Sequence, residues 1–286
     1  MDVKAVREAF ADRIRQVADI ESPSLIQALA TVPREDFVGP GPWKIMRPTE
    51  LNRGYVPTPD ADVSHIYDTV LVALDEDRQL NNGEPSSLLK WLDILTLKPG
   101  DDFLHIGCGV GYYTAVASVA VRPEGRVVGV EIDAELAARA KQNLAPYPHT
   151  EVIRGDGSGD LPGPFDAIFV NAGCTHPPLI WVDQLSVGGR LLVPLTMSSP
   201  MLNIGAGLML LVTRREDGYD ARFVTPVAIF HCDGCRSEDA DALLKKALAG
   251  RNSHTVRELR LDEHARTDAC WLHGRGYCLS ARESGA

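Results

Sequence analysis

The sequence of 286 residues lacks the features that place a protein on nucleic acid or across a membrane. It carries 29 Lys and Arg against 39 Asp and Glu, which gives a net charge of −10, and it has no run of five like charges. Duplex binding draws on basic patches that release counterions. The longest nearly uncharged apolar stretch, residues 201–212, is too short to span a bilayer. We therefore expect neither a nucleic-acid partner nor a membrane partner.

A secretory leader and a dense set of cysteines are missing as well. The first residues carry several charged side chains and no apolar core of the kind that a signal peptide has. The chain contains six cysteines, and reduced thiols are the rule in the cytosol. These features predict a cytoplasmic protein. The apolar fraction of 44% and the charged fraction of 24% are ordinary for a globular chain, and they leave the oligomeric state open.

Hydrophobic periodicity predicts where the helices and strands lie. Residues 2–31 and 85–97 show the spacing of amphipathic helices, whereas residues 38–63 are rich in Pro and Gly and predict an irregular segment. Strand and helix patterns alternate from Phe103 onward, which predicts a parallel sheet with helices on both faces. The alternating segments are 103–106, 114–120, 126–130, 134–144, 151–153, 166–170, 178–186 and 190–194, followed by late strands at 208–213 and 222–230.

The most informative motif is a glycine-rich turn between an apolar run and a helical pattern. Gly107, Gly109 and Gly111 alternate, and Glu131 ends the next apolar run. Glycines let the backbone turn tightly and approach a ligand, and a carboxylate in this position suits a ribose diol. A dinucleotide fingerprint would place its third glycine at 112, where this chain has Tyr. The motif favours S-adenosylmethionine over NAD, although a glycine turn in an ordinary α/β protein gives the same pattern.

Polar residues after two later strands fit the same ligand. Asp156 stands between two glycines after a short strand, where its carboxylate can accept from an adenine amine while the glycines leave room for a flat ring. Asn171 follows the strand predicted at 166–170, at the end of a parallel sheet where ligands bind. The order and spacing of these segments carry the prediction, because each segment alone is generic.

A further set of short motifs is more specific. Residues 32–38 read Val-Pro-Arg-Glu-Asp-Phe-Val. Other segments follow in order: Lys98-Pro99-Gly100, the glycine triplet with Tyr112, Gly155-Asp156-Gly157, Phe165-Asp166-Ala167-Ile168, Gly188-Gly189-Arg190-Leu191 through Pro194, and Arg222-Phe223-Val224. With these motifs the chain resembles the protein-L-isoaspartate O-methyltransferase family, which belongs to the S-adenosylmethionine-dependent methyltransferases. The resemblance covers roughly residues 1–232.

The resemblance implies an α/β fold of the Rossmann-like, seven-stranded methyltransferase type, with a mostly parallel sheet and helices on both faces. Residues 1–232 would form the methyltransferase core. Residues 233–286 are not in the minimal family enzyme, and we expect them to pack on the core as a small α/β appendix. Within them, Val256, Leu259 and Leu261 follow a period of two, which predicts one strand face turned inward.

The resemblance also implies which residues bind S-adenosylmethionine. His105 stands where the family has a glutamate, and a histidine buried against neighbouring helices is an equal alternative for it. Cys108 lies between glycines and suits a small filler better than a nucleophile. The full predicted set is His105, Gly107, Cys108, Gly109, Gly111, Tyr112, Glu131, Ile132, Asp156, Gly157 and Asn171.

The family's T-I-S-Q-P loop, twelve residues before its K-P-G, falls on residues 81–85, which read Asn-Asn-Gly-Glu-Pro. This position over the methyl donor makes Asn82, Gly83 and Glu84 the predicted catalytic residues. The family serine that is implicated at the substrate carboxylate falls on Gly83, which has no hydroxyl. Substrate contacts must then come from backbone amides or from Asn81, Asn82 or Glu84. Since like charges repel in a closed site, Glu84 should point outward, or the acceptor is not a carboxylate.

The favoured acceptor is a carboxylate, isoaspartyl or aspartyl, in a protein or peptide. A carboxylate is ionised at neutral pH and needs no general base, so alignment with the methyl donor is sufficient. An amine or hydroxyl acceptor would need a base, for which His65, His105 and His176 are candidates. Methylation of a small molecule at oxygen or nitrogen is the alternative, and a cofactor-binding protein that has lost catalysis is another.

Four residues have the composition of a zinc site, namely Cys232 and Cys235 with Cys270 and His273. The two pairs lie far apart in the sequence, and Cys278 competes with them as a ligand. Buried or free thiols are the favoured interpretation, so no metal is expected.

Overall fold

The computed structural model describes residues 2–198 and 204–282, so the start of the apolar stretch at 201–212 lies outside the described residues. The chain divides into two compact units. Unit 1 contains residues 1–102 and 108–155, and unit 2 contains residues 103–107 and 156–286. No helix within the described ranges is long and apolar enough to cross a membrane.

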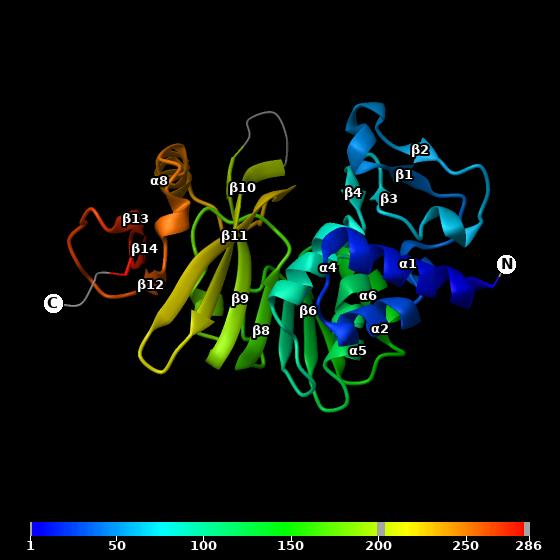
Figure 1. Ribbon diagram of the computed structural model, residues 1–286, viewed down its shortest axis with the longest axis horizontal. Coiled ribbons are helices and arrows are strands. Elements are labelled where there is room, and N and C mark those ends of the chain that lie inside the picture. Colours follow the sequence, from blue (N-terminus) through cyan, green and yellow to red (C-terminus); the bar gives the residue numbers. More distant parts are fainter. Residues whose placement is uncertain (1, 199–203, 283–286) are drawn as a thin grey trace. The chain divides into compact units, whose positions relative to one another are not determined.

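Unit 1 contains most of the helices (Figure 1). The side chains of Asp2, Ser22 and Asp133 accept hydrogen bonds from backbone N–H groups at three helix starts, as N-cap residues do. The predicted amphipathic face is present in the first helix, which buries Phe10 and Ile14. The helices are α1 (Val3–Ala18), α2 (Pro23–Thr31), α3 (Glu35–Val38), α4 (Pro85–Ile94), α5 (Tyr112–Ala120) and α6 (Ala134–Leu144).

The Pro- and Gly-rich segment at 38–63 differs from the irregular segment that the sequence predicts. It holds strands β1 (Lys44–Met46) and β2 (Val56–Pro57), which join β3 (Leu71–Asp75) and β4 (Leu80–Asn81) in an antiparallel sheet of order β2-β1-β3-β4. Two short 3-10 helices, η1 (Pro48–Arg53) and η2 (Val63–His65), lie between them. Strands of two to five residues are too short for hydrophobic alternation to show, so tertiary pairing decides their structure. Unit 1 also contains the parallel pair β6 (Val127–Glu131) and β7 (Thr150–Arg154).

The motif at 32–38 has a structural explanation in Arg34. Its side chain is fully buried, and its guanidinium donates to the carbonyl oxygens of Ile66 at 2.7 Å and Val70 at 2.9 Å. The Tyr67 hydroxyl also accepts from the Arg34 backbone N–H at 3.0 Å. A rigid fork of N–H donors suits this task, since it reaches several backbone acceptors of one loop at once. Arg34 therefore holds the chain that leads into β3.

In unit 2, strands β5 (Phe103–Ile106), β8 (Phe165–Val170) and β9 (Leu185–Met197) pair in parallel. Strand β10 (Ile204–Arg214) then pairs antiparallel with β9, and β11 (Tyr219–Phe230) pairs antiparallel with β10 (Figure 1). The helix predicted at 178–186 is wrong in extent, because α7 covers only Leu179–Val182 and β9 has already begun at Leu185. The physical reason is that Leu185 pairs with Phe165 of β8, and this strand pairing overrides the helical pattern.

The C-terminal segment adds α8 (Glu238–Ala249), a 3-10 turn η3 (Ser253–Thr255) and strands β12 (Glu258–Arg260), β13 (Cys270–Gly274) and β14 (Tyr277–Ser280) to unit 2. Strand β12 pairs with β11, and Trp271 packs edge-on against Phe223 of β11 at 4.8 Å between ring centroids. Val256 and Leu259 are buried, whereas Leu261 is half-buried and lies beyond β12. The strand order in unit 2 is β13-β14-β12-β11-β10-β9-β8-β5. The domain boundary after Cys232 stays a prediction.

Candidate functional site

The glycine turn leads into α5 in unit 1. Gly109 and Gly111 have φ angles of +58° and +91°, which L side chains rarely adopt. A Cβ at Gly111 would also lie 2.9 Å from Leu144 Cδ1. Cys108, between Gly107 and Gly109, is buried, and burial raises the pKa of its thiol far above the usual range. A protonated, buried thiol fits the role of small filler and not that of a nucleophile.

Glu131, at the end of β6, is tied to this turn. Its side chain is buried, and its Oε2 accepts from the Gly109 N–H at 2.7 Å while Oε1 accepts from the Asp133 N–H at 3.0 Å. Each carboxylate oxygen has two acceptor positions, so a second one remains on each for hydroxyl groups of a ligand. Ile132, the next residue, is exposed. Glu131 therefore positions the turn and keeps acceptor capacity.

Tyr112 begins α5 and is nearly inaccessible to solvent. Its ring packs edge-on against Phe37 and Tyr113, with centroid distances of 5.5 and 5.0 Å. Burial raises the pKa of Tyr112 well above its usual value, so the hydroxyl stays protonated. These contacts describe a packing role, and contact between Tyr112 and a cofactor stays a prediction.

The loop at 81–85 leads from β4 into α4, and most of its polar groups are already engaged. The Asn81 side chain accepts from the Gly83 N–H at 2.9 Å, and the Gly83 carbonyl accepts from the Tyr113 hydroxyl at 3.3 Å. Glu84 is the N-cap of α4 and accepts from the backbone N–H groups of Ser86 and Ser87, both at 2.9 Å.

Glu84 and Asn82 of this loop differ in whether their side-chain polar groups already have hydrogen-bond partners. The Ser86 and Ser87 hydroxyls also donate to the Glu84 carboxylate, at 2.7 and 2.8 Å. Glu84 therefore uses its charge on its own helix start. Asn82 is buried, and its Nδ2 has no hydrogen-bond partner among the described residues. Burying an amide N–H without a partner costs free energy, so a ligand that accepts from Asn82 would be favoured.

In unit 2, Asn171 follows β8 and lies beside Gly107. The Asn171 backbone N–H donates to the Ile106 carbonyl at 2.8 Å, and its side-chain amide reaches the Gly107 carbonyl at 3.5 Å. A Cβ at Gly107 would stand 3.4 Å from the Asn171 carbonyl oxygen. The structure therefore brings these two predicted residues together, and the φ of +74° at Gly107 favours glycine there.

Asp156 and Gly157 lie in the loop before β8. The Asp156 carboxylate accepts from the Ser158 hydroxyl at 2.6 Å and the Ser158 N–H at 2.9 Å, and these bonds lower its pKa below the usual value. Asp156 is thus ionised at neutral pH. Gly157 is buried, and its carbonyl accepts from Trp181 Nε1 at 2.9 Å. A Cβ there would stand 2.9 Å from Ile106 Cδ1, and the φ of +77° at Gly157 also favours glycine.

His105 lies inside β5 and is buried. Its ring stacks on Phe169 of β8 with 5.1 Å between centroids. Burial lowers the pKa of His105 to about 3, so the imidazole is neutral at physiological pH. The structure thus shows a buried ring packed against β8, and contact between His105 and a cofactor stays a prediction.

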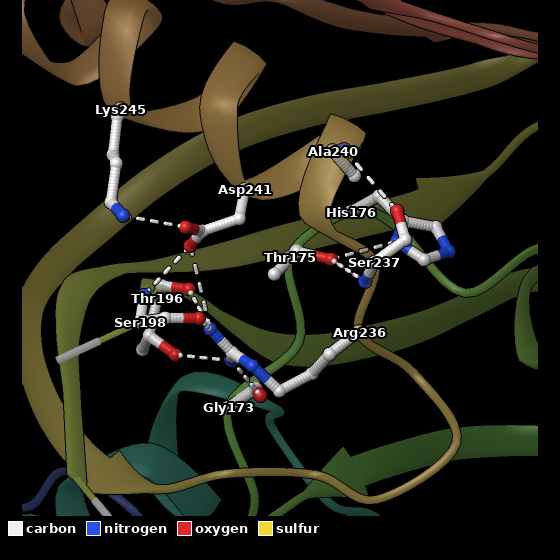
Figure 2. Close-up of polar contacts among 10 residues, drawn as sticks. All are labelled: Gly173, Thr175, His176, Thr196, Ser198, Arg236, Ser237, Ala240, Asp241 and Lys245. Carbon is white, nitrogen blue, oxygen red and sulfur yellow. Dashed lines mark hydrogen bonds and ion pairs between the residues drawn. The ribbon is translucent and has the colours of Figure 1, made fainter. Parts of the chain in front are cut away.

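Sequence reasoning missed a polar network around Arg236 in unit 2, which Figure 2 shows. The Arg236 guanidinium donates to the carbonyl oxygens of Gly173 at 2.5 Å and Thr196 at 2.9 Å, and to the Ser198 hydroxyl at 2.8 Å. Asp241 of α8 accepts from the Ser198 N–H at 2.7 Å. Nothing in the sequence pattern marks Arg236, because two of its acceptors are backbone carbonyls, which leave no trace in residue identity, and the others are hydroxyls of Thr196 and Ser198, which are distant in the sequence. The network joins α8 to the end of β9 and to the loop after β8.

The same loop places His176 and a group of thiols. His176 Nδ1 lies 3.1 Å from the Thr175 hydroxyl, and its ring stacks on Tyr277 (Figure 2 shows the Thr175 contact). Burial lowers the pKa of His176, which leaves its ring neutral at neutral pH. The thiols of Cys174, Cys232 and Cys235 lie within 4.8 Å of one another.

The hydrogen bond from Cys174 to Cys235 lowers the pKa of the Cys235 thiol, and the bond from Cys232 adds to the effect. The zinc composition noted in the sequence is therefore divided between two clusters. Cys232 and Cys235 gather with Cys174, whereas Cys270 and His273 gather with His264 and Cys278. None of the six cysteines, all within the described ranges, forms a disulfide.

Comparison with known proteins identifies the family. The sequence profile of the Protein-L-isoaspartate(D-aspartate) O-methyltransferase (PCMT) family matches residues 5–205. The chain is 30% identical over 197 residues to the Protein-L-isoaspartate O-methyltransferase of Methanopyrus kandleri, covering 67% of this chain and 77% of that protein. It is 33% identical over 198 residues to Protein-L-isoaspartate O-methyltransferase 2 of Archaeoglobus fulgidus, covering 68% and 80%.

Solved structures confirm the fold class. A protein-L-isoaspartate O-methyltransferase superposes with a TM-score of 0.64 at 22% identity, covering 90% of this chain and 72% of that chain. A Plasmodium falciparum protein described as a protein-L-isoaspartate O-methyltransferase, in complex with S-adenosyl-L-homocysteine, gives a TM-score of 0.59 at 16% identity, covering 79% and 98%. The predicted α/β, Rossmann-like methyltransferase fold is thus confirmed, with a mixed sheet. The chain belongs to the protein-L-isoaspartate O-methyltransferase family and is an S-adenosylmethionine-dependent methyltransferase.

Proposed function

We propose that the protein transfers the methyl group of S-adenosylmethionine to a side-chain carboxylate, isoaspartyl or aspartyl, of a protein or peptide. Two relatives that this chain matches over 77% and 80% of their length are named protein-L-isoaspartate O-methyltransferases. A carboxylate is ionised at neutral pH, so the reaction needs a donor and an acceptor held in line and no proton transfer. The free thiols of all six cysteines suit a reducing compartment such as the cytoplasm.

Several residues are proposed to hold the cofactor. Glu131 would accept from the ribose hydroxyls with the acceptor positions that Gly109 and Asp133 leave unused. Asp156, which is ionised, would accept from the adenine amine. The other predicted cofactor-binding residues would line the cofactor or shape the glycine turn beside it. They are His105, Gly107, Cys108, Gly111, Tyr112, Ile132, Gly157 and Asn171.

The negative charge of Glu84 is compatible with a carboxylate acceptor. Its oxygens accept two backbone N–H groups and two serine hydroxyls at the start of α4. The N-terminus of a helix carries partial positive charge, which offsets that of the carboxylate. The loop therefore presents little net negative charge to a substrate, although it contains an acidic residue.

The observation that carries the proposal is the buried amide of Asn82. Its Nδ2 has no partner among the described residues, whereas the Gly83 N–H is taken by Asn81. We assign to Asn82 the contact that the family serine makes from the next position. An amide N–H can donate to a carboxylate oxygen as a hydroxyl does, and a hydrogen bond to a charged group contributes about 1.5–3 kcal/mol.

The test compares two substitutions of Asn82 in an assay with labelled methyl donor. The acceptors are an isoaspartyl peptide, its aspartyl twin and a control without peptide. We expect base-labile label on one of the two peptides with the parent protein. Asn82→Ala should lower kcat/KM by about 10- to 100-fold, because it removes a donor worth the energy given above. S-adenosylhomocysteine affinity should not change.

Asn82→Asp serves as the matched variant, because it keeps the shape and replaces the donor by a negative oxygen. For a carboxylate acceptor it should be more damaging than Asn82→Ala, since like charges repel. If Asn82→Asp is as active as the parent protein or more active, the acceptor is not a carboxylate. If label stays on neither peptide while the cofactor binds, peptide carboxyl methylation is excluded.

His176 favours one second candidate, methylation of a small molecule at oxygen or nitrogen. His105 is in the core, and His65 pairs with Asp60 at 2.9 Å, but His176 is half-buried and neutral, as a general base must be. His176→Gln separates the two functions. Carboxylate methylation should keep its rate, whereas a base-dependent reaction should slow by about 100-fold or more.

A further inference from the structure

Four side chains of the C-terminal segment meet at one point of unit 2. They are His264, Cys270, His273 and Cys278, and one ligand atom from each lies within 4.8 Å of the other three. The Cys270 Sγ and His264 Nε2 are 3.7 Å apart. Zinc with Zn–S bonds of about 2.3 Å and Zn–N bonds of about 2.0–2.1 Å in tetrahedral geometry separates such a pair by about 3.6 Å. The group therefore has the spacing of a tetrahedral metal site.

The hairpin of β13 and β14 is shaped so that three of these residues share a face. His273 pairs directly with Cys278, and Cys270 pairs with Ser280. On a regular strand, residues 270 and 273 would face opposite sides of the sheet. The register shifts between Cys270 and Leu272, and such a bulge turns the side chain of Cys270 to the face that His273 and Cys278 occupy.

His264 reaches the same point from the loop after β12. Its Nδ1 lies 3.0 Å from the Asp262 carbonyl oxygen. This contact fixes the proton on Nδ1 and leaves the lone pair of Nε2 directed toward Cys270. Metal-binding histidines almost always have such a partner on their other nitrogen.

The remaining contacts suit a thiolate and an imidazole on a metal. The Thr267 backbone N–H donates to the Cys270 sulfur at 3.3 Å, as donors around zinc-bound sulfur do. The Nδ1 of His273 is buried and has no hydrogen-bond partner among the described residues. Burial of a ring nitrogen without a partner costs free energy, and a metal ion at this atom removes the cost.

We propose that His264, Cys270, His273 and Cys278 form a structural Zn²⁺ site that closes the C-terminal hairpin. A set of two thiolates and two imidazoles with no carboxylate favours Zn²⁺ over Mg²⁺ or Ca²⁺, which prefer oxygen ligands. Four protein ligands complete a tetrahedral shell, so the site is structural and not catalytic. It supplies a segment of about 50 residues with the additional stabilisation that its small apolar core does not give.

The first test measures zinc in the purified full chain by mass spectrometry. We expect the parent protein to hold one more equivalent of zinc per chain than either Cys278→Ser or His264→Ala. The matched control is Cys235→Ser, which removes a cysteine from the other thiol cluster of unit 2 and should leave this equivalent in place. If Cys235→Ser loses this equivalent and Cys278→Ser retains it, the zinc is bound by the cluster of Cys174, Cys232 and Cys235, and the proposal is overturned.

A second test does not depend on the folding of the variants. The parent protein is stripped with a chelator, and Co²⁺ is added as a spectroscopic probe. Tetrahedral cobalt bound to two thiolates should give strong visible bands together with a sulfur-to-metal charge-transfer band, and Zn²⁺ should displace them. The chelator should also lower the melting temperature of the parent protein and leave that of Cys278→Ser unchanged. A folded parent protein that binds neither metal, or a disulfide between Cys270 and Cys278 in the native protein, would refute the site.

Discussion

Glu131 is the residue on which the proposed cofactor site depends most directly. It is buried, it receives backbone N–H groups from both Gly109 and Asp133, and it retains acceptor positions for a ribose. Glu131→Ala should raise the Kd for S-adenosylhomocysteine about tenfold or more, since about 1–3 kcal/mol is lost when a buried hydrogen bond is removed. Isothermal calorimetry measures this change.

Glu131→Gln is the matched variant, because one oxygen still accepts while the amide replaces the other. Its Kd should lie between those of the parent protein and Glu131→Ala. An unchanged Kd in a folded Glu131→Ala protein, as judged by circular dichroism, would remove Glu131 from the cofactor site.

The residues that sequence reasoning identified share one property, which is that their chemistry can be read from their type. Glu131 ends a strand as an acid after a glycine turn, and Asp156 stands between glycines. Arg236 could not be predicted, because its acceptors, two backbone carbonyls and two hydroxyls, lie on segments distant in the sequence. The role of Glu84 was also missed. Its carboxylate accepts hydrogen bonds from the first turn of α4, so the acid that was expected to repel a carboxylate substrate is a helix cap.

At the scale of elements, the N-terminal helices of unit 1 are joined by one charged network. Arg7 of α1 donates to Glu35 of α3 at 2.7 Å, and the Tyr67 hydroxyl donates to the same carboxylate. Burial alone would raise the pKa of Glu35, but the hydrogen bonds from Tyr67 and Arg7 lower it below its ordinary value of 4.5. A carboxylate with a lowered pKa stabilises the fold above its unfolded pKa, and this stabilisation is lost as the pH falls through the folded pKa.

Glu35→Gln should therefore reduce the free energy of unfolding by about 1–3 kcal/mol at neutral pH. The difference from the parent protein should shrink below pH 4.5, because Glu35 of the parent protein loses its charge as the pH falls through its lowered pKa, whereas Gln does not titrate. Urea unfolding between pH 3 and 8 measures the difference. Glu8→Gln is the control, since its ion pair with Lys4 is exposed and contributes little at any pH. A pH-independent loss in Glu35→Gln would exclude the network as its cause.

Elements with long periodic patterns were predictable, whereas short ones were not. The helix at 134–144 and the strand at 103–106 match the predicted ranges, and the helical stretch predicted at 2–31 forms α1 and α2. The strands β1 to β4 have two to five residues each, so their pairing partners decide their structure. The helix that was predicted to reach residue 186 ends at Val182, because Leu185 pairs with Phe165 of β8 as part of β9.

At the scale of the whole molecule, the C-terminal segment is a structural part of unit 2. Strand β12 covers an edge of β11, Trp271 packs on Phe223, and the Arg236 and Asp241 contacts hold α8 to the end of β9. Deletion of residues 236–286 should therefore lower the melting temperature and cause association, because it exposes apolar surface and a strand edge. Differential scanning calorimetry and size-exclusion chromatography measure both effects. A truncated protein that is monodisperse, melts at the parent temperature and keeps the acceptor profile would contradict the prediction.

The order of the last three strands in the sheet differs from their order in the chain. Strand β14 follows β12 and β13 in the chain, yet it lies between them (Figure 1 shows the three strands at the red end of the chain). β13 and one edge of β12 therefore have no sheet partner until residues 277–280 pair with them. Open strand edges recruit wrong partners. A chain in which β14 has not yet paired therefore presents two such edges at once, so correct pairing of the last strand protects both β12 and β13 from misassembly.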